Sequence, residues 1–241
     1  MAKLTLSLTA RQQVAEGTMS FAFDLGGQKF SFKPGQYVNA TLPNPLYQDD
    51  EGSTRSFSIA SSPRDPFLMV ATRMRGSAFK RSLAEMPLGI PVNINGPMGS
   101  FTLPQDTATP VVLVAGGIGI TPFRSIVKHA AEQQAPHRLT LIYSNRTPEE
   151  APFLDDLYGW EKANPNFRFI PTMTRPDASK KPWQGRTGYI DAAFVRDALP
   201  GLDRFIAYVA GPPGLVQGVT KTLLGAGVPQ DNIRTEEFAG Y

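Results

Sequence analysis

The hydrophobic pattern of the chain changes once, at residues 104–110, and this change limits what each part can fold into. Before it, short runs of alternating apolar and polar residues recur at even spacing, separated by glycine and proline turns. After it, continuous apolar runs alternate with amphipathic segments. The first pattern is typical of an antiparallel barrel, and the second of a doubly wound parallel sheet. We therefore predict an antiparallel β-barrel over residues 1–103 and an α/β domain over residues 110–241.

Each part divides into short elements that the pattern predicts in turn. Alternation predicts the strands of the first part and one short helix over residues 77–86. Continuous apolar runs in the second part predict strands buried on both faces. The expected strands are 3–8, 20–24, 37–42, 56–60, 67–72, 92–95, 111–115, 139–143, 167–173 and 204–210, and the later helices are 122–134, 151–163, 191–199 and 213–225. Loop 174–188 is long and polar, so we expect it to be functional.

The absence of cysteine from the 241 residues excludes several kinds of redox and metal chemistry. Without thiols there is no disulfide, no cysteine-held zinc or iron–sulfur cluster and no cysteine nucleophile. The two histidines are too few for most histidine metal sites, and we expect no metal. Any redox reaction must therefore depend on a bound organic cofactor.

Charge and hydropathy argue against two further classes of partner. The formal net charge of +3 is spread over both parts, so nucleic acid is not an expected partner. The longest apolar run, residues 111–120, is about half the length that spans a bilayer. Residues 1–8 alternate as a strand does and lack the apolar core of a signal peptide. We expect a cytoplasmic protein with no membrane span.

Glycine-rich turns end two of the predicted buried strands. Residues 116–122 read Gly-Gly-Ile-Gly-Ile-Thr-Pro and open a helix. Glycine lets the backbone approach a phosphate, and a helix N-terminus favours negative charge. An ordinary tight turn has the same composition, and the spacing differs from the GxGxxG dinucleotide pattern. Residues 210–215, Ala-Gly-Pro-Pro-Gly-Leu, repeat the arrangement, and the two turns together predict one crevice at the carboxyl ends of parallel strands.

Two segments of the first part carry side chains suited to a phosphate and a flat ring. Arg55-Ser56-Phe57-Ser58 begins a predicted strand, where Arg55 offers a two-pronged donor and Phe57 an aromatic face. Residues 96–101, Gly-Pro-Met-Gly-Ser-Phe, form a turn followed by an apolar side chain. Taken alone, the first segment is better explained by a surface arginine, a core phenylalanine and a turn serine. The second could be only a hairpin turn followed by a core phenylalanine.

Taken together and in order, these segments resemble the ferredoxin–NADP reductase superfamily. The motifs are Arg-x-Phe-Ser, Gly-Pro-x-Gly-x-Phe, Gly-Gly-x-Gly-x-Thr-Pro, Ala-Gly-Pro-Pro and a C-terminal Glu-Glu-Phe, with residues 32–38 matching an early strand of the family. The resemblance covers essentially the whole chain. It implies an FAD-binding barrel and an NAD(P)-binding α/β domain. It also implies an oxidoreductase that passes hydride from NAD(P)H to flavin N5 and then electrons to a protein acceptor such as ferredoxin, flavodoxin or an oxygenase component.

The resemblance assigns a role to several residues of the first part. It implies that Arg55 pairs with the flavin pyrophosphate and that Phe57 stacks on the isoalloxazine ring. Ser58 is expected to hydrogen-bond near flavin N5, and Thr72 to border the ring. The amides expected to bind the pyrophosphate at a helix start are those of Gly76, Ser77 and Ala78.

In the second part, the resemblance implies contacts with the dinucleotide and a cover for the flavin. Phe238 matches the C-terminal aromatic residue that lies on the other face of the flavin, and Glu236 matches the nearby family acid. Tyr241, at the chain end, is the fallback covering residue. Ser58, Glu236 and Phe238 are thus the expected catalytic residues. The residues expected to hold the dinucleotide are Gly117, Gly119, Thr121, Gly211 and Pro212.

Two departures from the family pattern change details of the expected site. Phe57 lacks the hydroxyl of the tyrosine that the family usually has, which removes one hydrogen bond to the flavin. Ala210 stands where many relatives place a cysteine beside the nicotinamide, so we expect slower hydride transfer.

The coenzyme and the acceptor are less constrained than the fold. Ser144, Asn145 and Arg146 follow the second strand of the nucleotide domain, where relatives contact the adenosine ribose. Ser144 and Arg146 could bind a 2′-phosphate. The segment Asn-Arg-Thr-Pro-Glu-Glu also resembles NADH-using relatives, and no second arginine or tyrosine pair follows at the spacing common in NADPH users, so the sequence slightly favours NADH. Arg175 or the lysines at 180–181 could compensate if their loop folds over. A flavin or small-acceptor reductase, a non-catalytic subunit and a nucleotide-binding module remain alternatives.

Overall fold

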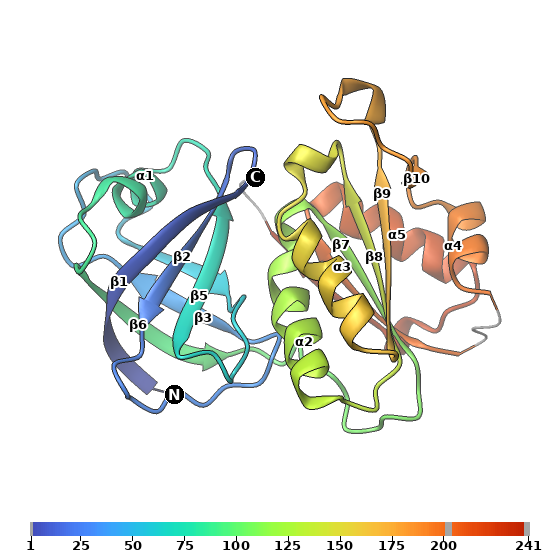
Figure 1. The fold of residues 1–241 in the computed structure, drawn as a ribbon, viewed down its shortest axis with the longest axis horizontal. Coiled ribbons are helices and arrows are strands. Elements are labelled where there is room, and N and C mark those ends of the chain that lie inside the picture. The colour runs from blue at the N-terminus through green and yellow to red at the C-terminus, as the bar shows by residue number, and fades with distance from the viewer. Residues whose placement is uncertain (1, 201–203, 239–241) are drawn as a thin grey trace.

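The computed structural model describes residues 2–200 and 204–238, which form two sheets on either side of a junction. Figure 1 shows the N-terminal strands on one side, and the second sheet with its helices on the other. Within these residues, no helix is long and apolar enough to cross a membrane.

The N-terminal part is a six-stranded antiparallel sheet in the order β4-β3-β6-β1-β2-β5. The two edge strands, β4 and β5, are linked beyond the end of β4, where the amide of Ala60 donates to the carbonyl of Met69 at 2.8 Å. Apolar side chains that alternate along the strands fill the interior. The predicted antiparallel barrel is confirmed. Its elements are β1 (Ala2–Ala15), β2 (Thr18–Asp24), β3 (Tyr37–Thr41), β4 (Thr54–Ser58), β5 (Phe67–Arg73), α1 (Ala78–Glu85) and β6 (Pro91–Met98).

Strand β1 is more than twice as long as the strand predicted over residues 3–8. Its first half pairs with β6 and its second half with β2, as far as Ala15. Register shifts after Leu8 and after Gln13 bend the strand between its partners. Residues 9–13 are mostly exposed, so backbone pairing extends the strand where the side-chain pattern gives no signal.

The C-terminal part is a parallel sheet in the order β10-β9-β8-β7-β11-β12, as predicted. Helices α2 and α3 pack on the face nearer the barrel, and α4 and α5 cover the opposite face. The strands are β7 (Val111–Gly116), β8 (Leu139–Asn145), β9 (Phe167–Met173), β10 (Arg186–Thr187), β11 (Ile206–Gly211) and β12 (Ile233–Glu237), and the helices are α2 (Ile120–Gln133), α3 (Leu154–Ala163), α4 (Ala192–Ala198) and α5 (Pro213–Gly225).

The strand order reverses between β7 and β11, the two strands that end in glycine turns. From β7 the chain adds β8 and β9 on one side, and later β11 and β12 on the other. In open α/β sheets, the crevice at such a reversal is where ligands bind. The predicted crevice therefore has the topology of a ligand site.

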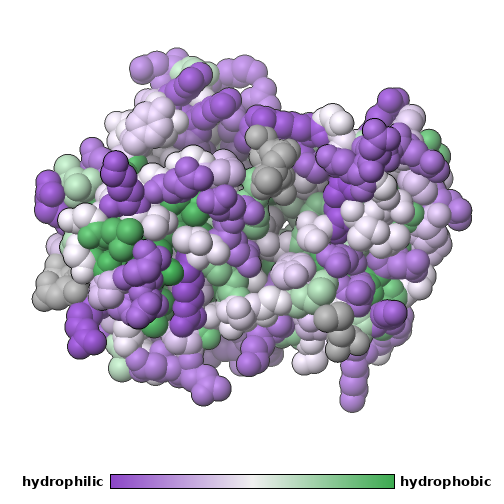
Figure 2. Space-filling model, turned by 180° about the vertical axis from the view of Figure 1, so that it is seen from behind, coloured by the Kyte–Doolittle hydropathy of each residue, from purple (hydrophilic) through white to green (hydrophobic). Residues whose placement is uncertain are grey.

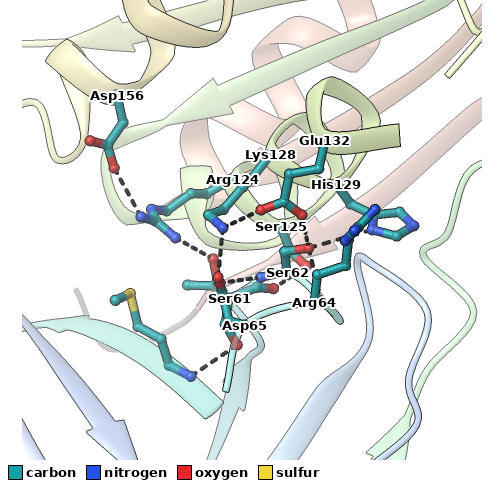
Figure 3. A network of polar contacts seen from close by, with 12 residues as sticks. Ser61, Ser62, Arg64, Asp65, Arg124, Ser125, Lys128, His129, Glu132 and Asp156 are labelled. Carbon is teal, nitrogen blue, oxygen red and sulfur yellow. Dashed lines mark hydrogen bonds and ion pairs between the residues drawn. The ribbon is translucent and has the colours of Figure 1, made fainter. Parts of the chain in front are cut away.

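The loop after β4 is held against α2, the helix that opens at this crevice. Arg124 donates one hydrogen bond to the carbonyl of Ala60 at 2.7 Å and another to Asp156 at 2.9 Å. The hydroxyl of Ser125 donates to the carbonyl of Ser61 at 2.6 Å. Arg124 is only 7% exposed, so these bonds lie inside the junction (Figure 3).

A second set of polar contacts extends this attachment along the next turn of α2. The ammonium of Lys128 lies 2.6 Å from Asp65 and also bonds Glu132. The hydroxyl of Ser62 donates to Glu132 and lies 3.4 Å from Nδ1 of His129. Figure 3 shows these side chains converging from the two domains. Because β4 leads directly into this loop, the position of β4 relative to α2 is determined by these contacts.

Candidate functional site

A cavity of about 380 Å³ lies between the two domains, and both contribute to its walls. Figure 2, which views the molecule from behind, shows the surface hollowed between the domains. The walls combine aromatic and aliphatic side chains with two carboxylates and several hydroxyls. The lining residues are Tyr37, Ser56, Phe57, Ser58, Ala71, Ile118, Thr121, Glu236, Glu237 and Phe238.

Strand β4 brings Phe57 and Ser58 to the barrel side of this cavity. The strand pairs with β3, which places Phe57 opposite Val38 and Ser58 opposite Tyr37. Phe57 is 5% exposed and packs on Phe79, with ring centroids 5.8 Å apart. It therefore belongs to the barrel core and contributes only a small part of its surface to the cavity. Ser58 is also nearly buried, with its position fixed by the strand.

A second cavity of about 580 Å³ continues from the first, because Ser56 and Phe57 line both. Its other walls include Arg55, Gly76 and Ser77. Ser77 caps helix α1, and its side chain accepts a hydrogen bond from the amide of Lys80. The helix N-terminus and the arginine thus face a common space, which is a favourable arrangement for an anion.

The two cavities together match the chemistry of a flavin with a phosphate tail. The first offers apolar walls for a flat ring and hydroxyl groups near its edge. The second offers a guanidinium and a helix N-terminus, which are the usual donors to phosphate. The predicted residues that line the cavities are Phe57, Ser58, Thr121, Glu236 and Phe238 in the first, and Arg55, Phe57, Gly76 and Ser77 in the second.

The glycine turns meet at the switch point for two different physical reasons. Gly117 has φ of +52°, with nothing within 4 Å of where a Cβ would lie, so its role is conformational. At Gly119 a Cβ would lie 2.2 Å from the carbonyl oxygen of Ala210, so this glycine permits close packing of two chain segments. At Gly211 a Cβ would lie 3.0 Å from the carbonyl oxygen of Gly116, and the φ of +151° also favours glycine there. Of these two turns, only Ile118 and Thr121 reach the cavity.

Strand β12, which the sequence analysis did not delimit, carries two of the predicted residues into the cavity. It pairs in parallel with β11, and Glu236 lies opposite Ala210. The amide of Phe238 donates to the carbonyl of Gly211 at 2.9 Å, which fixes the chain at the end of the strand. Burial raises the pKa of Glu236 from its ordinary 4.5 to about 7. An acid with this pKa can hold or release a proton near neutral pH.

The raised pKa predicts a pH dependence of stability that belongs to Glu236. The folded state favours the protonated acid, so this contribution is fully present below about pH 4.5. It is lost as the pH rises to about 7. We expect Glu236→Gln to remove it. Urea unfolding at pH 5 and pH 8 measures this. The free energy of unfolding of the variant, relative to that of the wild type, should be higher at pH 8 than at pH 5. Glu237→Gln, at the exposed neighbour, is the control, and a constant difference for Glu236→Gln would contradict the assignment.

Several predicted residues lie away from both cavities. Thr72 is fully buried with its hydroxyl directed to the carbonyl of Arg73, and its neighbour Ala71 lines the first cavity instead. Pro212 is the N-cap of α5. Ala78, the first residue of α1, does not line the second cavity, but its amide donates to Asp49, which does. Tyr241 lies outside the described residues.

The predicted ribose-contacting residues lie at the carboxyl end of β8. Ser144 and Asn145 are buried, whereas Arg146 is exposed. The amide of Arg175 donates to the carbonyl of Arg146 at 2.9 Å, so the ends of β8 and β9 lie side by side. The loop that follows β9 thus brings a second exposed arginine next to the first.

Some of the lining residues were not predicted from the sequence. Tyr37 and Ile118 line the first cavity. Asp49, Glu51 and Lys80 line the second, where the sequence analysis expected only donors to phosphate. Tyr37 follows the Pro-Gly turn at 34–35 and precedes Val38, so its position in an alternating strand could be predicted from the sequence. The side of the barrel on which its side chain lies could not.

Comparison with protein families matches both parts of the chain. Residues 5–103 match the oxidoreductase FAD-binding domain, and residues 113–221 match the oxidoreductase NAD-binding domain. The chain belongs to the ferredoxin–NADP reductase superfamily. The predicted cofactors, FAD and a nicotinamide nucleotide, are thereby supported by the domain each part matches.

Individual relatives of this superfamily are similar over most of the chain. Ferredoxin–NADP reductase B of Sorangium cellulosum is 29% identical over 225 residues, covering 88% of this chain and 87% of the relative. Reductase component 2 of terephthalate 1,2-dioxygenase from a Comamonas species is 28% identical over 215 residues, covering 88% of this chain. The chain spans only 61% of that component's length.

A solved structure shows the same fold. The ferredoxin NADP⁺ reductase of Neisseria gonorrhoeae, with bound FAD and NADP, superposes with a TM-score of 0.79. The superposition covers 98% of each chain, and the two sequences are 21% identical.

Proposed function

We propose that this protein is a flavin-dependent NAD(P)H oxidoreductase that passes electrons to a redox protein. The observation that carries the proposal is the cavity between the domains. It joins Phe57 and Ser58 of the barrel to Thr121, Glu236 and Phe238 of the nucleotide domain. A flavin bound there would supply the redox chemistry by accepting a hydride from the coenzyme and giving electrons to the acceptor.

The residues of the chain supply position, exclusion of water and control of a proton. Phe57, Ile118 and Phe238 form apolar walls that suit a flat ring. The hydroxyl of Ser58 is placed to hydrogen-bond at the ring edge, and Glu236 to hold a proton nearby. Arg55 and the N-terminus of α1 suit the phosphates.

The acceptor is proposed by class. The similar proteins include a reductase component of a dioxygenase and a ferredoxin–NADP reductase. We therefore propose ferredoxin, flavodoxin or an oxygenase component as the acceptor of this chain.

The visible absorption spectrum of the purified chain with added FAD tests the proposal. We expect a bound flavin band that bleaches when NADH or NADPH is added without oxygen and returns when ferricyanide or a ferredoxin is added. A chain that binds no flavin, or that binds it without bleaching, would refute the proposal.

A second candidate is a flavin reductase, which releases the flavin that it reduces. Two carboxylates beside Arg55, those of Asp49 and Glu51, favour it because they would weaken the hold on a phosphorylated flavin. Gel filtration separates the two candidates, because a resident flavin elutes with the protein and an exchangeable flavin does not.

The neighbouring arginines predict how the coenzyme is chosen. The sequence slightly favoured NADH because no second arginine or tyrosine pair followed Arg146 at the spacing common in NADPH users, but the backbone of Arg175 is bonded to that of Arg146 in the structure. Two guanidinium groups suit a 2′-phosphate. We expect Arg146→Ala and Arg175→Ala each to lower kcat/KM for NADPH about tenfold, or about 1.4 kcal/mol, with NADH unchanged. Lys162→Ala, at an exposed lysine of α3, is the control, and equal losses with both coenzymes would contradict the assignment.

Phe238 predicts a competition between the C-terminal segment and the nicotinamide. It is half-buried, and it lines the cavity where the coenzyme must meet the ring. Stacking on a ring contributes about 1 kcal/mol, so Phe238→Ser should bind NAD⁺ or NADP⁺ about fivefold more tightly, while Phe238→Tyr should resemble wild type. Titration with the oxidised coenzymes and a thermal melt measure this. If Phe238→Ser melts earlier with unchanged binding, Phe238 is only a packing residue.

A further inference from the structure

The carboxylate of Asp49 makes the two contacts that a phosphate would make in the second cavity. One of its oxygens accepts a hydrogen bond from the amide of Ala78, at the start of α1, at 2.8 Å. The other lies 3.3 Å from Nη2 of Arg55. A carboxylate and a phosphate oxygen accept the same hydrogen bonds. Asp49 thus satisfies the helix N-terminus and the arginine at the same time.

The two terminal nitrogens of the Arg55 guanidinium are engaged by the loop that carries Asp49. Its Nη1 donates to the carbonyls of Glu51, Gly52 and Thr54 at 2.8–2.9 Å. Its Nη2 pairs with the carboxylate of Glu51 at 2.7 Å as well as with Asp49. The carbonyl bonds hold the arginine in place through Nη1, and the carboxylates occupy Nη2, the other terminal nitrogen. A phosphate must therefore share or displace a carboxylate to reach this nitrogen.

The charges around the cavity are balanced rather than positive. Arg55, Arg75 and Lys80 line it, but so do three acids, Asp49, Asp50 and Glu51. The amide of Ala78 and the charge of Arg55 hold the pKa of Asp49 below its usual range, so its carboxylate is ionised at neutral pH. Asp49 is 29% exposed and Glu51 is 73% exposed, so water screens Glu51 more strongly. Asp49 is therefore the stronger of the two competitors.

We propose that Asp49 is an internal competitor for the phosphate-binding end of the flavin site, and that it weakens the binding of phosphorylated flavins relative to riboflavin. The inference rests on the proposed function, because it needs a flavin in the two joined cavities. A ring held in the first cavity feels little of Asp49, whereas the phosphates of FAD and FMN meet its charge directly. Asp49 thereby sets how readily FAD leaves the protein.

Flavin titration of the wild type and of Asp49→Asn tests the proposal without any turnover. Asparagine keeps the size of the side chain and an oxygen that can accept from the amide of Ala78, but it removes the charge. We expect Kd for FAD and for FMN to fall at least tenfold, or about 1.4 kcal/mol, and Kd for riboflavin to change less than twofold. Quenching of flavin fluorescence at fixed ionic strength measures all three.

Two further variants control for general charge and for folding. Asp50→Asn removes a charge from the same cavity that forms no ion pair with Arg55, and it should leave the affinity for FAD nearly unchanged. Glu51→Gln removes the more exposed partner of Arg55 and should tighten FAD binding about threefold. A thermal melt of each variant shows that it is folded, and Glu51→Gln carries the test if Asp49→Asn is not.

The outcomes separate this inference from the proposed function. If FAD binds both proteins with equal affinity, or binds Asp49→Asn more weakly, Asp49 organises the site instead of competing for it, and the inference is overturned while the function stands. If riboflavin tightens as much as FAD, the effect is not on the phosphates, and the inference is likewise overturned. If no flavin binds either protein, both the function and the inference are overturned.

Discussion

Gly119→Ala is expected to lower the free energy of unfolding by about 3 kcal/mol. A Cβ at this position would lie 2.2 Å from the carbonyl oxygen of Ala210 and 2.7 Å from the Cα of Gly211. All of these atoms belong to the backbone where β7 and β11 end, so no side-chain rotation can relieve the contact. The turn and the strand must move apart, which opens the switch point. Urea unfolding of the variant and the wild type measures the loss.

Two other glycines provide matched controls for this prediction. Gly117→Ala meets no atom within 4 Å but must hold φ of +52°, which costs about 1 kcal/mol. Gly214→Ala, in the first turn of α5, has neither problem and should be neutral or slightly stabilising. If Gly119→Ala costs no more than Gly117→Ala, then the turn can relax, and the close approach at Ala210 does not limit the fold.

The reason for Gly119 shows where sequence reasoning stops. The glycine turn could be predicted because it directly follows a continuous apolar strand. The sequence analysis attributed its glycines to the approach of a phosphate, but the α-carbon of Gly119 faces the backbone of Ala210. These residues are neighbours only because β11 pairs with β7, a pairing between distant segments that no local pattern reports. The role of a glycine in packing therefore needs the topology.

Arg55 shows the same limit for electrostatics. The sequence analysis expected it to face a phosphate, and the structure places it in a cavity suited to one. It also places Asp49 between Arg55 and the amide of Ala78. Asp49 and Ala78 are 29 residues apart in the chain. The sequence analysis assigned no role to the acids at positions 49–51. Which anion lies next to Arg55 depends on how the loop that carries Asp49 folds back over it. That is a property of the tertiary structure and cannot be predicted from a local sequence pattern.

The fold itself was more accessible than the site. The strands with alternating or continuous apolar residues were found close to their true bounds, and α5 was predicted at residues 213–225, where it occurs. The second half of β1 was missed because its side chains are mostly exposed. Strand β12 was not delimited because it is short and has a single apolar residue, Ile233, followed by four polar ones. Backbone pairing at a sheet edge creates such strands without a hydrophobic signal.

Arg124→Met is expected to lower the free energy of unfolding by about 3 kcal/mol. The substitution keeps most of the apolar length of the side chain but removes the donor to the carbonyl of Ala60, which is itself fully buried. That carbonyl then lies in the junction without its charged donor. The loss of stability should be greatest in the loop after β4. The rate of amide hydrogen exchange should therefore rise more at residues 60–62 than in the barrel core. Urea unfolding and hydrogen exchange measure the two effects.

Asp156→Asn separates the two bonds that Arg124 makes. The carboxylate of Asp156 is 44% exposed, so water can replace its share of the ion pair, and we expect this variant to lose under 1 kcal/mol. A small loss for Asp156→Asn beside a large loss for Arg124→Met would exclude the ion pair as the main source of stability. It would leave the bond with Ala60 and the contacts of the guanidinium with the rings of Phe153 and Trp160. Equal losses would assign it to the ion pair with α3. In the first case the buried guanidinium is one of the contacts, with those of Ser125 and Lys128, by which α2 holds the loop after β4 directly.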